Sequence, residues 1–126
     1  MASILEFEDL DCWKMARELV NTTYILCRNE QLRKDYELSN QIKRAALSIM
    51  NNIAEGFERH TNRDKCHFIT IASASCSEVK SMLYVLLDLK IITKEEFDKH
   101  KEQTLHTQRL VKGFLRYLSS KKEYKK

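Results

Sequence analysis

Proline is absent from this chain of 126 residues, and glycine occurs only twice, at Gly56 and Gly113. Sandwiches and barrels built from β-strands need many tight turns, and such turns are rich in these two residues. A chain almost without them has few turns and long, uninterrupted helices. The composition therefore excludes an all-β fold and favours an all-α fold of few, long elements.

Other classes of protein also lack support in the sequence. No apolar run approaches the ~20 residues that cross a bilayer, so no membrane span is expected. An acidic segment follows Met1, which predicts that there is no signal peptide. None of the cysteines forms a C-x-x-C pair, which favours free thiols and a cytoplasmic location. The cysteines are Cys12, Cys27, Cys66 and Cys76.

The charge is unevenly distributed along the chain. The net charge is +4, with 43% hydrophobic and 32% charged residues, a composition typical of a globular protein. Between Leu105 and Lys126 there are seven basic residues and one acidic residue, a net charge of +6, whereas the rest of the chain sums to −2. The positive excess therefore lies at the C-terminus.

Hydrophobic periodicity predicts four helices, at about residues 9–28, 36–59, 62–89 and 93–118, followed by a basic tail at 119–126. Residues 29–35 are charged and aperiodic, and a loop is expected there. The expected apolar stripe of the second helix is Ile42, Ala45, Ala46, Ile49, Ile53 and Gly56; that of the third is Phe68, Ile71, Ala72, Ser75, Val79, Met82, Leu83 and Leu86. The fourth stripe is weaker, because the polar residues His100 and Thr107 interrupt it.

The connections between these helices indicate how they pack. Thr61 with Asp64, and Thr93 with Glu96, have the spacing of a capping box at the start of the third and fourth helices. Gly56 would cost about 1 kcal/mol inside a helix, so a packing reason is expected for it. Short connections make neighbouring helices antiparallel, which predicts a single domain with an up-down-up-down four-helix bundle. The second and third helices, rich in small residues, are expected to pack most closely.

Residues 41–59 resemble a motif of one bacterial family, the four-helix-bundle proteins encoded in intervening sequences of 23S ribosomal RNA genes. The family pattern is Q-I-x-R-A-A-x-S-I-x-x-N-I-A-E-G-x-x-R, and every fixed position is matched. Met50 and Ala74 stand where the family often has proline and glycine. Further matches lie in the first and third helices, at Trp13, Ala16, Phe68, Ile71, Ala72, Ser75 and Glu78.

The resemblance implies more than a fold. It implies a bundle that commonly assembles into a homopentamer. It also implies kinship with the accessory variability determinant proteins of diversity-generating retroelements, which bind nucleic acid and a reverse transcriptase. The partners expected on this ground are further copies of the chain, RNA or DNA, and a reverse transcriptase or another protein.

A row of polar residues runs beside the apolar stripe of the second helix at spacings of three and four: Gln41, Arg44, Ser48, Asn52, Glu55 and Arg59. Glu78 on the third helix is their expected partner. One interpretation is a recognition surface. The favoured interpretation is a polar network that fixes helix register or subunit packing.

Two basic groups are candidates for binding phosphates. The first lies at the expected second turn and contains Arg59, His60, Arg63 and Lys65. The second follows the fourth helix as Arg109, Lys112 and Arg116, continued by Lys121, Lys122, Lys125 and Lys126. Tyr117 and Tyr124 could stack on unpaired bases. The alternative is a solvated face with a solubilising tail; a ring assembly would favour binding, because it repeats the charged segment.

The sequence contains no pattern typical of an enzyme, a metal site or a cofactor site. There is no glycine-rich phosphate loop, nucleophile elbow or Glu-x-x-His pair. No histidines or cysteines have the i, i+3 or i, i+4 spacing of helical metal ligands. The leading hypothesis is a non-enzymatic, oligomeric bundle that binds nucleic acid, with structured RNA preferred. The alternatives are a protein-interaction scaffold, for example for a reverse transcriptase, and a purely structural oligomer.

Overall fold

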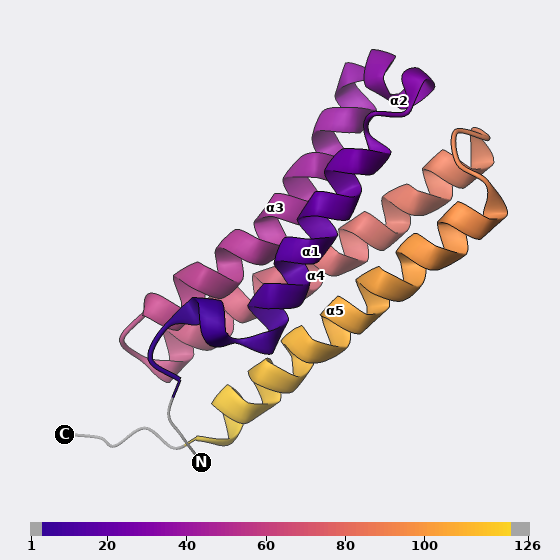
Figure 1. Ribbon diagram of the computed structural model, residues 1–126. Coiled ribbons are helices and arrows are strands. Elements are labelled where there is room, and N and C mark those ends of the chain that lie inside the picture. The colour runs from indigo at the N-terminus through magenta and orange to yellow at the C-terminus, as the bar shows by residue number, and fades with distance from the viewer. Residues whose placement is uncertain (1–3, 122–126) are drawn as a thin grey trace.

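The computed structural model describes residues 4–121 and is built of helices (Figure 1). A short 3-10 helix, η1, precedes the α-helices. Their bounds are η1 Phe7–Asp9, α1 Asp11–Leu26, α2 Glu30–Lys34, α3 Tyr36–Glu58, α4 Asn62–Asp88 and α5 Lys94–Ser120. The predicted all-α class is confirmed, and the four long helices are those that the periodicity predicted.

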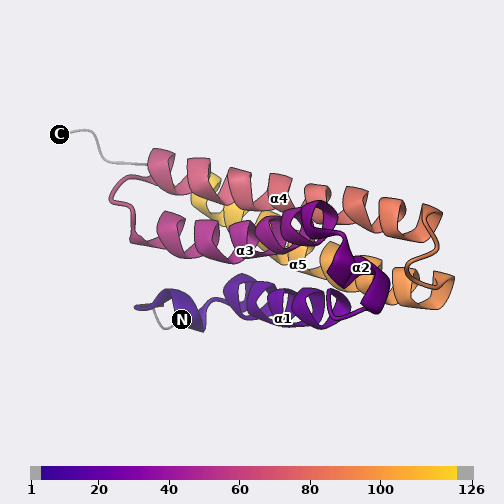
Figure 2. The same cartoon turned by 90° about the horizontal axis from the view of Figure 1, so that it is seen from above.

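The long helices form an antiparallel up-down-up-down bundle, as predicted. Helix α1 packs against α3 and α5, and α4 packs against the same two helices from the other side, so the four form a closed square in cross-section. Figures 1 and 2 show the long helices running side by side, with α2 at one end. The contact between α3 and α4 is the most extensive, as their small residues predicted, and that between α1 and α5 is sparser.

The core has two parts, one toward each end of the bundle. The first joins all four long helices through residues such as Leu19, Ile49, Ile53, Val79 and Val111, each fully buried. Burial of each such side chain stabilises the fold by roughly 1.5–3 kcal/mol. The second part lies beneath α2 and the α4–α5 connection and includes Leu32, Ile42, Leu83, Leu86 and Phe97.

Two details of the fold differ from the sequence expectation. Residues 29–35 are not a loop: Asn29 caps α2 by accepting hydrogen bonds from the backbone N–H groups of Gln31 and Leu32, and Leu32 is completely buried. The buried face of α4 also differs in part from the predicted stripe, of which Ala72, Ser75, Val79, Leu83 and Leu86 are buried as expected. Ile69 and Cys76 are fully buried, while Phe68 and Ile71 lie half-buried at the edge. Because α4 packs against both α3 and α5, its buried face points between them.

The connections position the ends of the helices. Thr61 caps α4 by accepting a hydrogen bond from the Asp64 N–H, and Thr93 with Glu96 forms the predicted full capping box of α5. Helix α4 ends in a Schellman motif, in which Ile91 N–H donates to Leu86 O and Lys90 N–H to Leu87 O. Lys90 has φ 60°, the left-handed conformation that this motif requires.

Within the described part of the chain, none of the helices combines the length and apolar character needed to span a bilayer.

Candidate nucleic-acid interface

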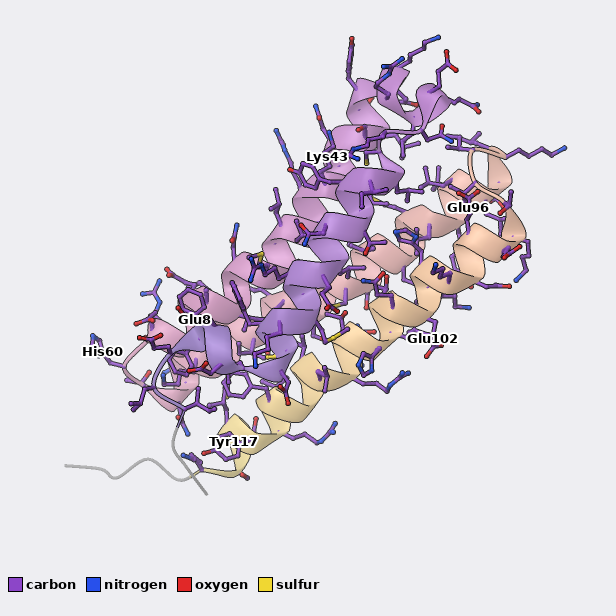
Figure 3. All side chains as sticks on the ribbon, in the orientation of Figure 1. Glu8, Lys43, His60, Glu96, Glu102 and Tyr117 are labelled. Carbon is purple, nitrogen blue, oxygen red and sulfur yellow. The ribbon has the colours of Figure 1, made fainter. Side chains whose placement is uncertain are left out.

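The structure brings the basic turn to the same end of the bundle as the last described part of the basic row on α5. The side-chain amide of Asn62, the first residue of α4, donates to Leu118 O at 3.0 Å and lies 3.4 Å from Lys121 O. These bonds fix the end of α5 beside the α3–α4 turn. His60 of the turn and Tyr117 of α5 are labelled at this end in Figure 3. Arg116 and Lys121 therefore share this end of the molecule with the cations of the turn, whereas Arg109 lies near the middle of α5.

The cations of the turn are partly engaged in holding the fold. Arg59 pairs with Glu55 at 2.7 Å and lies 4.4 Å from the centroid of the Phe68 ring. The Lys65 ammonium donates to Phe57 O at 2.7 Å, at the C-terminal end of α3, where a positive charge is favourable. Arg63 is exposed on the first turn of α4. Lys65 thus has a structural role in addition to its charge.

The predicted row on α5 is exposed to solvent. Arg109 pairs with Glu102 at 3.2 Å, while Lys112 and Arg116 border a shallow groove between α4 and α5. Lys121 lies with its ammonium 4.6 Å from the centroid of the Tyr117 ring, which is 54% exposed. Lys122 and the remaining predicted tail cations, with Tyr124, lie outside the described residues.

The predicted polar row on α3 divides into a half-buried and an exposed part. Ser48 bonds to Ser75 of α4 at 2.8 Å, and Asn52 donates to Ser48 Oγ at 3.0 Å. This supports the interpretation of a network that fixes register between α3 and α4. The other residues of the row, with Glu78, are exposed: Gln41, Arg44, Glu55 and Arg59. Ser75, rather than Glu78, is therefore the α4 partner of the row within the chain.

Comparison with known proteins identifies the family. Residues 8–113 match the family of 23S rRNA-intervening sequence proteins, from η1 to the last third of α5. The chain belongs to this family. The resemblance predicted from the sequence is confirmed.

The solved structure of another protein has the same fold as this chain. It is the 1.70 Å crystal structure of a protein of unknown function from the S23 ribosomal protein family of Bacteroides thetaiotaomicron. The TM-score is 0.76 at 23% sequence identity, over 82% of this chain and 97% of the other. No curated protein matches the sequence.

The structure also reveals a polar seam that the sequence analysis did not assign. Gln108 of α5 donates through Nε2 to Ser73 O and to Ser77 Oγ of α4, both at 2.9 Å. On the α1 side, Gln103 donates to Thr22 Oγ1 at 3.0 Å. The interruptions expected in the fourth stripe were His100 and Thr107, and no role was predicted for the two glutamines. The glutamines connect α5 to its two neighbouring helices.

Buried titratable groups are directed into the core rather than toward this interface. Burial raises the pKa of Cys12 and of Cys76 to about 12 each, and it also raises the pKa of Cys27. Burial lowers the pKa of His100. Across residues 4–121, no three His, Cys, Asp or Glu side chains gather as they would around a metal ion. The exposed charges, not these groups, define the chemistry of the surface.

Proposed function

We propose that this family member is a non-enzymatic nucleic-acid-binding protein that acts as a homo-oligomer on structured RNA. The observation that carries the proposal is the pair of Asn62 hydrogen bonds, because they place the basic turn and the basic end of α5 together. Arrays of lysine and arginine bind phosphates through charge and the release of counterions. The bundle serves as a rigid scaffold for these cations.

The exposed polar residues of α3 and α4 support the oligomeric part of the proposal. Gln41, Arg44 and Glu78 lie on the surface although the family motif includes them. Such residues can pair with a second copy of the chain, and a ring repeats the basic end of each protomer around one axis. Sedimentation equilibrium of the purified protein measures this assembly, and a monomer at all concentrations contradicts it.

Fluorescence anisotropy of a labelled, structured RNA across a salt series tests the binding. Lys112→Gln/Arg116→Gln/Lys121→Gln is the test variant. It is expected to weaken binding and to lower the salt slope by about 2–3, since each of the three phosphate contacts contributes roughly 0.7–0.9. Arg28→Gln/Arg33→Gln/Lys34→Gln removes the same charge at the opposite end and is the matched control. Equal effects of the two variants contradict a localised interface, and absence of binding at low salt contradicts the function.

A second candidate is a scaffold for a protein partner such as a reverse transcriptase. A groove between α3 and α4, at the end away from the basic turn, favours it. The groove is lined by Leu38, Met82, Val85 and Leu89 beside Asp35 and Glu37. Val85 is 42% exposed and Leu89 53% exposed. Binding of a defined protein partner that survives nuclease treatment and is lost in Val85→Ser/Leu89→Ser would establish this function.

A further inference from the structure

The groove between α4 and α5 has a distinctive lining. Its α4 side is formed by the small side chains of Ser73, Ala74 and Ser77, and its α5 side includes Lys112, Leu115 and Arg116. Because the exposed α4 side chains are small, a hollow remains above them, and the long cationic side chains of α5 border it. The groove therefore combines room for a narrow ligand with positive charge along one wall.

Both walls of the groove come from segments without acidic residues. Residues 65–77 of α4 contain no aspartate or glutamate, and neither do residues 103–121, which form the second half of α5 and its end. Of the cations in these segments, Arg109 pairs with Glu102 just outside its segment, whereas Lys112 and Arg116, which line the groove, lie further from that carboxylate along the helix. An anionic ligand would meet attraction along the whole groove, since like charges are absent from both walls.

The floor of the groove also offers a hydrogen-bond donor. Gln108 Nε2 donates to Ser77 Oγ at 2.9 Å, which fixes the position of that hydroxyl. An oxygen that accepts this bond still has its own O–H proton to donate. Ser77 is exposed, so this proton can reach a ligand in the groove. The groove thus offers phosphate oxygens three kinds of donor: the hydroxyl of Ser77, the ammonium of Lys112 and the guanidinium of Arg116.

We propose that the α4–α5 groove binds the phosphodiester backbone of an unpaired segment, such as a loop, of the structured RNA, an inference that rests on the proposed function. A single strand can sink between two helices where the side chains are small, whereas a duplex is a wide, rigid cylinder that touches only the tips of the cations. Basic grooves that track one backbone are typical of proteins that bind single strands. Contacts to phosphate carry no sequence information, so the binding is tolerant of sequence.

A groove-filling substitution tests the shape of the site without changing its charge. Ala74→Gln places a long neutral side chain in the groove, at an exposed helical position. Ser81→Gln is the matched control, because Ser81 is exposed on the same helix seven residues further on and does not line the groove. Ser77→Ala keeps the shape and removes only the hydroxyl. Helicity and the midpoint of urea unfolding verify that each variant is folded.

The measurement is anisotropy of labelled oligouridine and of an RNA duplex of equal length, at one low salt concentration. The wild type is expected to prefer oligouridine. Ala74→Gln is expected to weaken binding of oligouridine about tenfold, equivalent to about 1.4 kcal/mol, and that of the duplex much less. Ser77→Ala is expected to weaken oligouridine binding a few-fold, and Ser81→Gln to leave both affinities unchanged.

The outcomes separate this inference from the proposed function. If Ala74→Gln binds oligouridine as the wild type does, while binding remains salt-dependent, the assignment of the site to the α4–α5 groove is wrong. The proposed basic interface is then unaffected. If Ala74→Gln weakens both ligands equally, or the wild type prefers the duplex, the assignment to an unpaired strand is overturned. If the wild type binds neither RNA at low salt, the proposed function and the inference fail together.

Discussion

At the residue scale, the two glycines occupy very different surroundings. A Cβ built on Gly56 would lie 3.0 Å from Ile69 Cδ1, 3.1 Å from Phe68 Cβ and 3.2 Å from Lys65 O. The packing reason expected for Gly56 is thus the close approach of α3 and α4. Gly113 lies in open surroundings, where the same Cβ would have Arg116 Nη2 as its neighbour at 3.8 Å.

Gly56→Ala and Gly113→Ala are therefore expected to change stability in opposite directions. In Gly56→Ala, overpacking that costs ~1–3 kcal/mol outweighs a gain of about 1 kcal/mol in helix propensity. Gly113→Ala keeps the gain and is expected to stabilise the protein by up to about 1 kcal/mol. Urea unfolding followed by circular dichroism measures both. Shifts of the same sign would contradict this account of the two sites.

The cations show how much of a site a sequence can predict at this scale. The sequence locates Arg59 and Lys65 in a basic group, and the structure shows that Arg59 pairs with Glu55 and that Lys65 donates to Phe57 O. The i, i+4 spacing of Glu55 and Arg59 would have allowed the first contact to be predicted. A bond to a backbone carbonyl at a helix end depends on the path of the turn, which the residue types do not specify.

At the scale of elements, the helix ends were the most predictable part of the fold. Thr61 and Thr93 cap their helices as the spacing indicated, because a capping bond joins residues only three apart. The sequence indicated the C-terminal end of α4 less clearly. Its Schellman motif places Lys90, not glycine, in the left-handed conformation. A residue with a Cβ is strained there by roughly 1 kcal/mol.

Lys90→Gly is therefore expected to stabilise the protein by about 0.5–1 kcal/mol, because glycine adopts a positive φ without that cost. Lys90→Ala is the matched control: it removes the same charge but keeps the Cβ, and no such gain is expected from it. Thermal unfolding midpoints of the three proteins provide the measurement. Equal gains in both variants would show that the Lys90 charge, rather than its conformation, opposes folding.

At the scale of the whole molecule, the contact between α1 and α5 encloses buried polar groups. His100 and Thr23 are buried there, and within residues 4–121 neither His100 Nε2 nor Thr23 Oγ1 has a hydrogen-bond partner. Burial disfavours the charged imidazole and lowers the pKa of His100 below its usual 6.5. Protonation of this residue in the folded bundle is thus opposed by its surroundings.

The stability of the whole bundle is expected to fall as the pH drops below about 6.5. Below that pH the unfolded chain binds a proton at His100, whereas the folded chain does so only at a lower pH, so acid favours unfolding. Above about 6.5 this contribution to stability is fully present. Urea unfolding at a series of pH values measures the effect, which is expected to shrink in His100→Gln. An unchanged loss of stability in that variant would contradict the role of His100.

The sequence by itself determined the all-α class, the long helices, the caps and the family, because each depends on residues close together in the chain or on a contiguous motif. Only the tertiary structure decided that the buried face of α4 extends to Ile69 and Cys76, that residues 30–34 form α2, and that Asn62 joins the basic turn to the end of α5. The α4–α5 groove also belongs to this group. These features depend on contacts between helices far apart in sequence, and local periodicity carries no information about which helix lies opposite.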